Sequence, residues 1–360
     1  MSPEQMFEVV YKTIDDCVIT TNVYVPTQAT TSDDVSSKEL PTAIIFHGGA
    51  FMLGHSRMNS TLLINECLSR KWLVVAPNHR LCPQVNILDG PITDCRDLLT
   101  WIHAGHLDHA LTSHSHPGIR VSKPQIIAMG TSSGGTMAHS LAWNWDNGMT
   151  PSPPIAILDF YGAKDFAHPF WSQPLTSSGF GFPTPPPLTP DIESQIYTAH
   201  PIPTTDTISL EGQTPTPSSS SDRPHLTPRQ IFAFNQIVSG TVIRTNYPPG
   251  SPSDPSTFRP IDPLHNLSPS YPPTCIIHGT ADTTVPIEHS HAVHQELARL
   301  GARTKMIEVE GQNHTFLGAL VEGRDEEGEV WKKCLEGVEW IAGFLGTGRE
   351  GEGEGEKRGV

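Results

Sequence analysis

The sequence predicts an α/β fold with a mostly parallel central sheet flanked by helices. Short apolar runs, typical of buried parallel strands, alternate with helical patterns along most of the chain. Such alternation is the usual pattern of an α/β sheet, and most of the apolar runs end in a turn with Gly, Pro or Asn. With 360 residues, the chain is long enough for one large domain with an insertion, or for two ordinary domains.

The predicted sheet opens with two neighbouring strands, which we expect to pair like a hairpin: "FEVVYKTI" and "CVITTNVYVP". Six further strands are predicted in chain order: "TAIIFHG", "WLVVAPN", "QIIAMGT", "IAILDFYG", "TCIIHGT" and "TKMIEVEG". Helical patterns are predicted between and after them, at about Ser60–Arg70, Ile92–Gly105, Gly134–Trp145, Glu288–Leu300 and Glu329–Phe344.

One proline-rich block interrupts this alternation. Residues 151–273 hold 25 of the 34 prolines, a composition that does not form a regular core of its own. Two helices are nevertheless predicted inside the block, at about Asp191–Thr198 and Thr227–Val238. We therefore expect one domain over residues 1–345 with an insertion at about 165–262. The acidic, glycine-rich tail at 346–360 is expected to be disordered.

Composition excludes several classes of partner. The formal charge of −15, with no stripe of Lys and Arg, would repel nucleic acid. The N-terminus lacks the pattern of a signal peptide, and no apolar run reaches the length of a membrane span. The six cysteines lack C-x-x-C spacing, so we interpret them as free thiols and expect a cytoplasmic protein.

The stretch "GTSSG", Gly130–Gly134, matches the pattern G-x-S-x-G between a predicted strand and a predicted helix. In that context the central serine occupies a tight strand-to-helix turn, where only small neighbours fit. Ser132 is therefore the candidate nucleophile. Ser133 follows at the helix N-terminus, where a backbone N–H and the helix dipole favour negative charge. The competing interpretation is a glycine-rich turn capped by serine.

A serine hydroxyl needs a positioned base to act as a nucleophile at neutral pH. "HGTADTTVP" places Asp282 directly after a predicted strand, and "EGQNHTF" places His314 in the loop after the next strand. The order serine, aspartate, histidine is that of the α/β-hydrolases. Asp282 and His314 are therefore the candidate orienting acid and general base, although an isolated Asp or His in a loop is more often simply solvated.

The stretch "FHGGAF" follows the first strand of the predicted parallel region. Two consecutive glycines allow backbone N–H groups to approach the oxyanion that forms in acyl transfer. We therefore expect Gly48, Gly49 and Ser133 to form an oxyanion hole. The competing interpretation of the stretch is a glycine-rich β-turn.

The motifs "HGGAF", "NHRLCP", "GTSSGG", "ILDFYG", "HGTADTTVP" and "GQNHTF" together resemble the hormone-sensitive-lipase-like and acetyl-esterase-like branch of the α/β-hydrolases. The resemblance covers about Pro41–Gly162 and Pro263–Phe344. It implies the roles given above, a structural role for Arg80, and a lid formed by the proline-rich insertion. Three positions depart from the family pattern: Ala50 at the third glycine, Ser133 where alanine is common, and His79 where tyrosine is usual. Ala50 and Ser133 both retain the backbone N–H.

The resemblance implies a serine esterase that cleaves a small, apolar ester through an acyl-enzyme, without a cofactor or metal. Alternatives stay open, because the D-x-x-VP form at Asp282 looks more like prolyl-oligopeptidase and dienelactone-hydrolase relatives. They are a peptidase, lactonase, thioesterase, acyltransferase or biosynthetic tailoring enzyme, and a ligand-binding protein without catalysis. Neither the natural substrate nor the oligomeric state follows from the sequence.

Two further groups of residues have competing interpretations. Seven aromatics of the insertion either line an acyl pocket or anchor the insertion to the core: Phe166, Phe170, Trp171, Phe180, Phe182, Phe232 and Phe234. Five histidines lie in "HAGHLDHALTSHSHPG", residues 103–118. Their spacing repeats no known set of metal ligands, so a solvated helix end and loop is favoured over a metal site.

Overall fold

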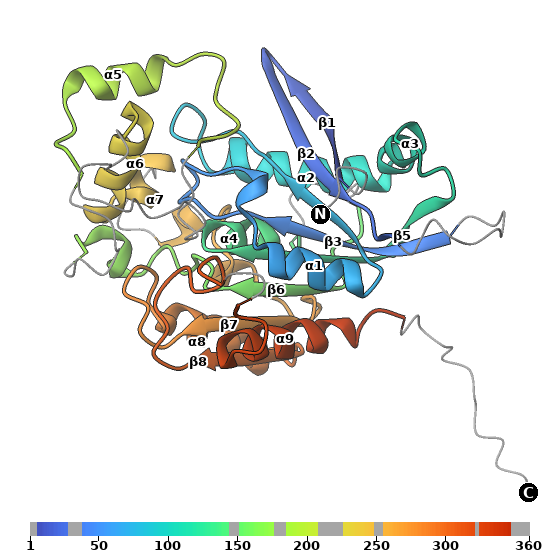
Figure 1. Ribbon diagram of the computed structural model, residues 1–360. Coiled ribbons are helices and arrows are strands. Elements are labelled where there is room, and N and C mark those ends of the chain that lie inside the picture. The colour runs from blue at the N-terminus through green and yellow to red at the C-terminus, as the bar shows by residue number, and fades with distance from the viewer. Residues whose placement is uncertain are drawn as a thin grey trace, which may run out of the picture.

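The computed structural model describes residues 6–27, 38–143, 151–175, 185–207, 226–247, 255–320 and 324–346. The predicted disordered tail lies outside these ranges from residue 347 onward. Within them, eight strands form one sheet in the order β1-β2-β4-β3-β5-β6-β7-β8 (Figure 1). The strands are β1 (Met6–Ile14), β2 (Cys17–Tyr24), β3 (Lys38–Phe46), β4 (Leu73–Pro77), β5 (Ile119–Thr131), β6 (Ala156–Phe160), β7 (Thr274–Gly279) and β8 (Thr304–Val309).

The pairing confirms the predicted α/β class and the opening hairpin. β1 pairs with β2, and β2 with β4, in antiparallel fashion, whereas all the remaining neighbours are parallel. β5 begins at Ile119, six residues before the predicted start, because Ile119–Val121 pairs with Lys38–Leu40 of β3. The sequence did not indicate this because polar residues interrupt β5 at 122–125.

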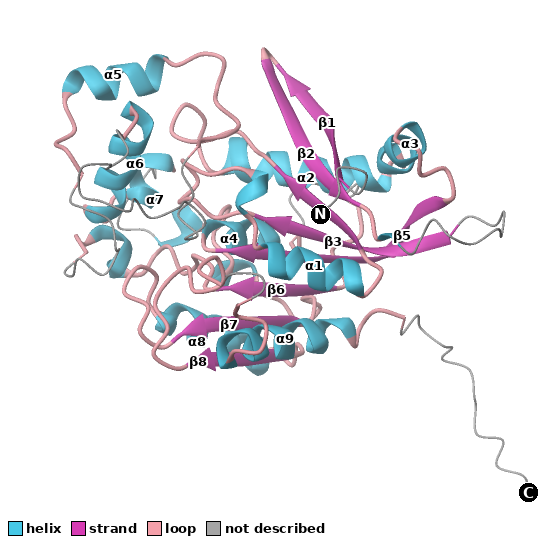
Figure 2. Ribbon diagram, viewed as in Figure 1, coloured by secondary structure: helices cyan, strands magenta, loops and turns pink. Residues whose placement is uncertain are grey.

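Helices cover both faces of the sheet (Figure 2). Among the described residues they are α1 (Thr61–Ser69), α2 (Thr93–His103), α3 (His106–Ser113), α4 (Ser133–Ser140), α5 (Pro190–Thr198), α6 (Pro228–Val238), α7 (Val242–Asn246), α8 (Ile287–Arg299) and α9 (Glu329–Ala342). Shorter 3₁₀ turns lie at Ser56–Met58, Pro169–Ser172, Pro255–Phe258 and Leu264–Asn266, and a π-helical turn at Leu88–Ile92.

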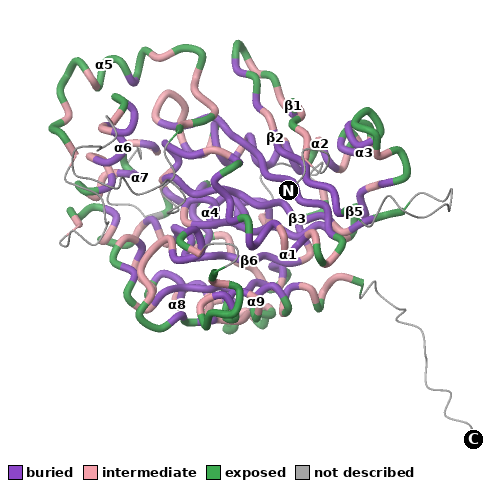
Figure 3. The backbone as a smooth tube through the Cα atoms, in the orientation of Figure 1, coloured by how far each residue is buried: buried purple, intermediate pink, exposed green. Residues whose placement is uncertain are grey.

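The two faces follow from the alternation of side chains along each strand. In β3, Ile44 and Phe46 belong to one core cluster, which includes residues of α2, α3, α4 and α8, whereas Ala43 and Ile45 belong to a second cluster, which includes residues of α1 and α9. The parallel strands β4, β6 and β7 are buried along their whole length, which is why they are largely apolar (Figure 3).

The segment between β6 and β7 carries α5, α6 and α7 and lies at the carboxyl ends of the parallel strands (Figure 1). Both predicted helices of the insertion are confirmed, and each begins at a Thr-Pro pair. The Thr189 and Thr227 hydroxyls accept hydrogen bonds from the first turns, and the following prolines lose no helical bond.

Arg229 of α6 links the segment between β6 and β7 to the loops that follow β3 and β4. Its buried guanidinium donates to the carbonyl oxygens of Cys82 (2.6 Å) and Met52 (3.3 Å), and to Oε1 of Gln84 (2.8 Å). Met52 follows the predicted oxyanion stretch directly. Burial lowers the pKa of Arg229, and the nearby carboxylate of Asp206 offsets this only in part.

Part of the histidine-rich segment is helical where a loop was expected, because residues 106–113 form α3. His106, His109 and His114 are exposed, as expected for a solvated segment. Leu107, Ala110 and Leu111 share one face and are buried against the sheet, which stabilises this short helix. In the part of the chain that the structure describes, no group of three or more His, Cys, Asp or Glu side chains could hold a metal ion. His114 instead stacks on Phe7, with ring centroids 4.0 Å apart.

All six cysteines are buried free thiols, as predicted. None of the described helices combines the length and apolarity that a membrane crossing requires.

Candidate active site

Ser132 lies between the end of β5 and the start of α4, in a backbone conformation with φ 51° and ψ −123°. A positive φ is uncommon for a residue other than glycine and stores strain in the turn. Neighbouring backbone holds it there: the Ser132 N–H donates to Phe160 O (3.0 Å), and the Ser132 carbonyl accepts from Gly135 N (2.9 Å) and Ala163 N (3.1 Å). The turn therefore has the geometry that G-x-S-x-G predicts.

The two glycines of the motif are required by close backbone approach. A Cβ at Gly130 would lie 2.0 Å from the carbonyl oxygen of Gly134. A Cβ at Gly134 would lie 2.3 Å from the carbonyl oxygen of Phe46 and 2.7 Å from that of His47. Gly134 therefore brings the start of α4 directly against the "HGG" stretch.

We predict that Gly134→Ala separates these two segments. The added methyl meets backbone on both sides, so the protein should lose about 2–3 kcal/mol of unfolding free energy. The reactivity of Ser132 per folded molecule should fall by roughly 100-fold, because the displaced segments no longer share their geometry. Urea unfolding and the rate of covalent labelling by a fluorophosphonate probe measure the two effects.

Gly118→Ala is the matched control, since a Cβ at Gly118 meets nothing within 4 Å. Wild-type activity and stability in Gly134→Ala would contradict the proposed contact.

His314 and Asp282 lie with Ser132 at the carboxyl ends of the strands. His314 Nε2 is 2.9 Å from Ser132 Oγ, and His314 Nδ1 is 2.6 Å from Asp282 Oδ2. The side chain of His314 is 8% exposed and that of Asp282 is 0% exposed. The structure thus brings together three residues that are up to 182 positions apart in the chain.

Asp282 accepts four hydrogen bonds. Oδ1 accepts from the backbone N–H groups of Thr284 (2.8 Å) and Val285 (2.9 Å), and Oδ2 accepts from His314 and from His278 Nε2 (3.0 Å). Burial opposes ionisation of Asp282, but His314 and His278 outweigh it and hold the pKa of the carboxyl well below its usual range. Asp282 is therefore a carboxylate at neutral pH.

Gly48 and Gly49 lie in the "HGG" stretch and Ser133 lies at the start of α4, so the predicted oxyanion donors are on the two segments that meet at Gly134. Among the described residues, none accepts a hydrogen bond from the backbone N–H groups of Gly48, Gly49 or Ser133. Ser133 is also the first residue of α4, where the helix dipole favours an anion. These N–H groups are thus available to a ligand oxygen.

The "NHRLCP" stretch packs against the segment that carries the predicted oxyanion donors. His79 stacks on His47 with ring centroids 4.7 Å apart, and His47 Nδ1 lies 2.6 Å from the carbonyl oxygen of Gly48. Arg80 forms a buried ion pair with Asp94 (2.8 Å), consistent with the structural role that the resemblance implies.

His278 is a residue of the site that the sequence analysis missed. It lies in β7 within the quoted motif "HGTADTTVP", four positions before Asp282, and its side chain is 0% exposed. The sequence signal was present, but a histidine in an apolar strand does not by itself indicate which group it contacts.

The aromatics of the insertion form a buried cluster with the sheet domain. Phe166, Trp171, Phe232 and Phe234 belong to it and Phe170 packs against it, whereas Phe180 and Phe182 lie outside the described residues. Their burial favours the anchoring interpretation over an open acyl pocket.

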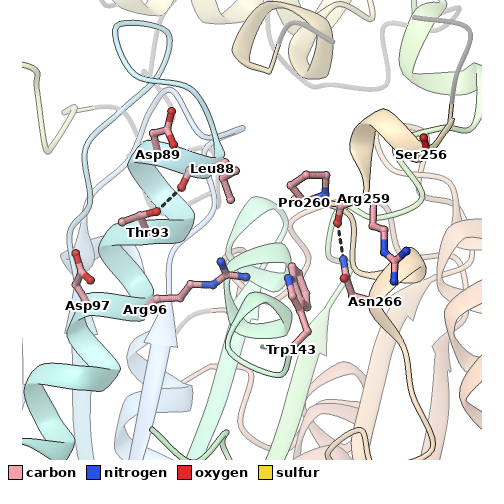
Figure 4. A pocket seen from close by; sticks show the side chains of 10 residues that line it. All are labelled: Leu88, Asp89, Thr93, Arg96, Asp97, Trp143, Ser256, Arg259, Pro260 and Asn266. Carbon is pink, nitrogen blue, oxygen red and sulfur yellow. Dashed lines mark hydrogen bonds between the residues drawn. The ribbon is translucent and has the colours of Figure 1, made fainter. Parts of the chain in front are cut away.

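A cavity of about 590 Å³ lies elsewhere, between α2 and residues 255–266 (Figure 4). On one side of the cavity, Arg96 extends over the ring of Trp143, 5.4 Å from its centroid. Arg259 lines the opposite side of the cavity. The residues lining this cavity do not include Ser132, Asp282 or His314.

Comparison with known families agrees with the fold. Residues 43–180 match a family model described as alpha/beta hydrolase fold, and residues 240–334 match the prolyl oligopeptidase family. The first match contains Ser132 and the "HGG" stretch, and the second contains Asp282 and His314. The second match accords with the predicted likeness of the D-x-x-VP form.

Similar proteins fall into two groups. Non-reducing polyketide synthases of Stereocaulon alpinum and Preussia isomera are 27% and 29% identical over 330 and 326 residues, respectively. The alignments cover 88% and 87% of this chain but only 12% and 14% of the synthases, so this chain spans a small part of these curated relatives. The propionate-bound esterase 2 of Thermogutta terrifontis superposes with a TM-score of 0.57 at 18% identity, covering 97% of both chains.

Proposed function

We propose that this chain, which has the α/β-hydrolase fold, is a serine hydrolase that cleaves a small carboxylic ester through an acyl-enzyme. The observation that carries the proposal is the continuous hydrogen-bonded series Ser132 Oγ, His314 and Asp282, with distances of 2.9 and 2.6 Å. Such a series supplies a nucleophile, its base and the group that orients the base.

In the proposed acylation, His314 Nε2 takes the proton of Ser132 as Oγ attacks the ester carbonyl carbon. The carbonyl π electrons move onto oxygen, and the N–H groups of Gly48, Gly49 and Ser133 stabilise the resulting oxyanion. When the tetrahedral intermediate collapses, the C–O bond to the alcohol breaks, and His314 returns the proton to the departing alcohol oxygen.

In the proposed deacylation, His314 removes a proton from water, and the resulting nucleophile attacks the acyl carbon. When the second intermediate collapses, the bond between the acyl carbon and Ser132 Oγ breaks, the acid leaves, and His314 returns the proton to Ser132 Oγ. Asp282 holds the imidazole with its Nδ1–H toward the carboxylate, so that Nε2 carries no hydrogen and can accept the proton of Ser132. No step of this scheme requires a cofactor.

The esterase proposal predicts hydrolysis of p-nitrophenyl acetate and butyrate, together with covalent labelling by a fluorophosphonate probe. Small acyl groups are chosen because the superposed esterase was solved with propionate. Absence of both hydrolysis and labelling would overturn the proposal and favour a ligand-binding protein.

A thioesterase or acyltransferase is the second candidate, and the similarity to polyketide synthases favours it. Nearly nine-tenths of this chain aligns with one part of each synthase, which points to acyl chemistry in assembly of a polyketide. The same acyl-enzyme forms from a thioester, with sulfur leaving in place of oxygen, and it can pass its acyl group to an acceptor other than water.

Paired substrates distinguish the two candidates. The same acyl group is offered as a p-nitrophenyl ester, as an N-acetylcysteamine thioester and as an anilide, and kcat/KM is compared. Product analysis with an added alcohol or amine then detects transfer. A strong preference for the thioester, or a transfer product that exceeds the free acid, would replace the esterase proposal.

We further propose that residues at about 165–262 form the lid of this domain, and that it acts in the cytoplasm. The location of α5, α6 and α7 at the carboxyl ends of the strands supports the proposed lid. The six free thiols support the proposed cytoplasmic location.

A further inference from the structure

A series of buried polar side chains leads from Asp282 away from Ser132 into the interior of the domain. His278 Nε2 is 3.0 Å from Asp282 Oδ2, and His278 Nδ1 is 2.7 Å from Ser290 Oγ of α8. Ser290 Oγ is 3.0 Å from Nζ of Lys164, which follows β6. Ser290, Lys164 and His278 are all 0% exposed.

The neighbours of His278 determine which of its nitrogens carries the proton. Nε2 faces the carboxylate of Asp282 and, at 2.9 Å, the carbonyl oxygen of Val285. Neither group has a hydrogen to donate, so Nε2 must be the N–H donor. Burial lowers the pKa of His278 despite the opposing effect of Asp282, so the ring is neutral and Nδ1 is an acceptor.

The direction of the remaining hydrogen bonds follows. Lys164 has only donors, so Ser290 Oγ accepts from Lys164 and gives its own hydrogen to His278 Nδ1. Every hydrogen in the series therefore points from Lys164 toward Asp282. In such a series each hydrogen bond polarises the next. The ammonium group of Lys164 therefore strengthens the hydrogen bond that His278 donates to Asp282.

Lys164 is itself held by an ion pair. Its Nζ is 2.7 Å from Asp159 Oδ2, which also lies 3.1 Å from His139 Nε2. Burial opposes ionisation of Asp159, but Lys164 and His139 outweigh it and keep the pKa of that carboxyl well below its usual range. Lys164 is thus fixed at the far end of the series.

We propose that Lys164, Ser290 and His278 are positioning residues that fix the orientation of Asp282 and, through it, of His314. The inference rests on the proposed function, in which His314 is the base. It adds to that function a buried support of the triad, contributed by β7, α8 and the segment after β6.

Removing the Ser290 hydroxyl tests this support. With Ser290→Ala, kcat per active site should fall about tenfold, the effect of one lost hydrogen bond of ordinary strength, while KM stays unchanged. Active sites are counted by fluorophosphonate titration, so a loss of folded protein does not enter kcat. Ser290→Thr keeps the hydroxyl and should stay within about twofold of wild type.

The pH profile separates positioning from a merely structural role. Without the series, Asp282 is less stabilised as an anion, and the triad is protonated more easily. The acidic limb of kcat/KM should therefore move to higher pH by about half a unit in Ser290→Ala. The titratable and charged groups that face His278 are Asp282, His314, Lys164 and Tyr161, and these variants leave all four in place.

His278→Gln provides a second variant. Its side-chain amide can still donate to Asp282 and Val285 but has no atom for Ser290, so it should reproduce the tenfold loss and the shifted limb of Ser290→Ala. If both variants keep wild-type kcat per site and a wild-type acidic limb, and lose only stability, the proposal is overturned.

A measurement that does not need activity keeps this inference separate from the proposed function. Imidazole ¹⁵N NMR, with His278 assigned by its absence in His278→Gln, should find the Nε2–H tautomer in wild type and a displaced Nδ1 signal in Ser290→Ala. The Nδ1–H tautomer would overturn the proposal. If wild type lacks hydrolysis and labelling but has the expected tautomer, the proposed function fails, and the series remains as a structural support only.

Discussion

Replacing Ser132 with alanine is expected to lower kcat/KM for p-nitrophenyl butyrate by at least about 10⁴-fold. Ser132 Oγ lies 2.9 Å from His314 Nε2, and alanine leaves His314 and Asp282 in place without an atom that can form the acyl-enzyme. Fluorophosphonate labelling should disappear together with hydrolysis. Stability should change little, because the side chain lies at the surface of the site.

Ser133→Ala is the control one residue away. Its Oγ is buried and, among the described residues, makes no hydrogen bond, whereas its proposed contribution is the backbone N–H, which alanine retains. The variant should keep activity within about twofold of wild type. If Ser133→Ala abolished turnover and Ser132→Ala did not, the turn would be assigned one residue out of register.

Replacing Asp282 with asparagine is expected to lower kcat by about 10³–10⁴-fold. All four partners of the carboxylate donate: two backbone N–H groups at Oδ1 and two imidazoles at Oδ2. Whichever way the asparagine amide is turned, its NH₂ group faces donors. Facing the imidazoles, it would favour the His314 tautomer with the proton on Nε2, which cannot accept from Ser132.

The Asp282→Asn variant should also lose about 1–3 kcal/mol of unfolding free energy at neutral pH. Because the pKa of Asp282 is lowered in the folded state, its contribution is fully present above the unfolded value of about 4 and is lost as pH falls through the folded value. Urea unfolding at several pH values should therefore find the two proteins converging at acid pH. Asp191→Asn, at an exposed position of α5, is the control, and equal kcat in Asp282→Asn and wild type would refute the assigned role.

Much of the sheet could be predicted because its signals are local. Continuous apolar runs such as β3 and β7 must be buried on both faces, and hairpin neighbours such as β1 and β2 pair over a short turn. The start of β5 could not be predicted, because it depends on pairing with a strand some 80 residues earlier. The short helix α3 depends on three residues that bury against a surface the sequence does not reveal.

The candidate site likewise contains residues that could be predicted from local signals and residues that could not. The turn at Ser132 could be predicted because steric limits at Gly130 and Gly134 leave a sequence pattern, and Asp282 and His314 each follow a strand. His278, Ser290 and Lys164 could not be predicted as a set. They lie on a strand, a helix face and a loop, and only tertiary packing brings them together.

The attachment of α6 has a consequence for how a substrate reaches Ser132. Moving α6 away would break the three hydrogen bonds that the buried guanidinium of Arg229 donates. One of them is to Met52, so the segment that follows the proposed oxyanion donors would lose its contact with α6. Opening the site by lifting α6 would therefore disturb the machinery it uncovers. We expect α6 to be a fixed wall of the site, so that the size and shape of accepted acyl groups are set before the substrate arrives and not by closure around it.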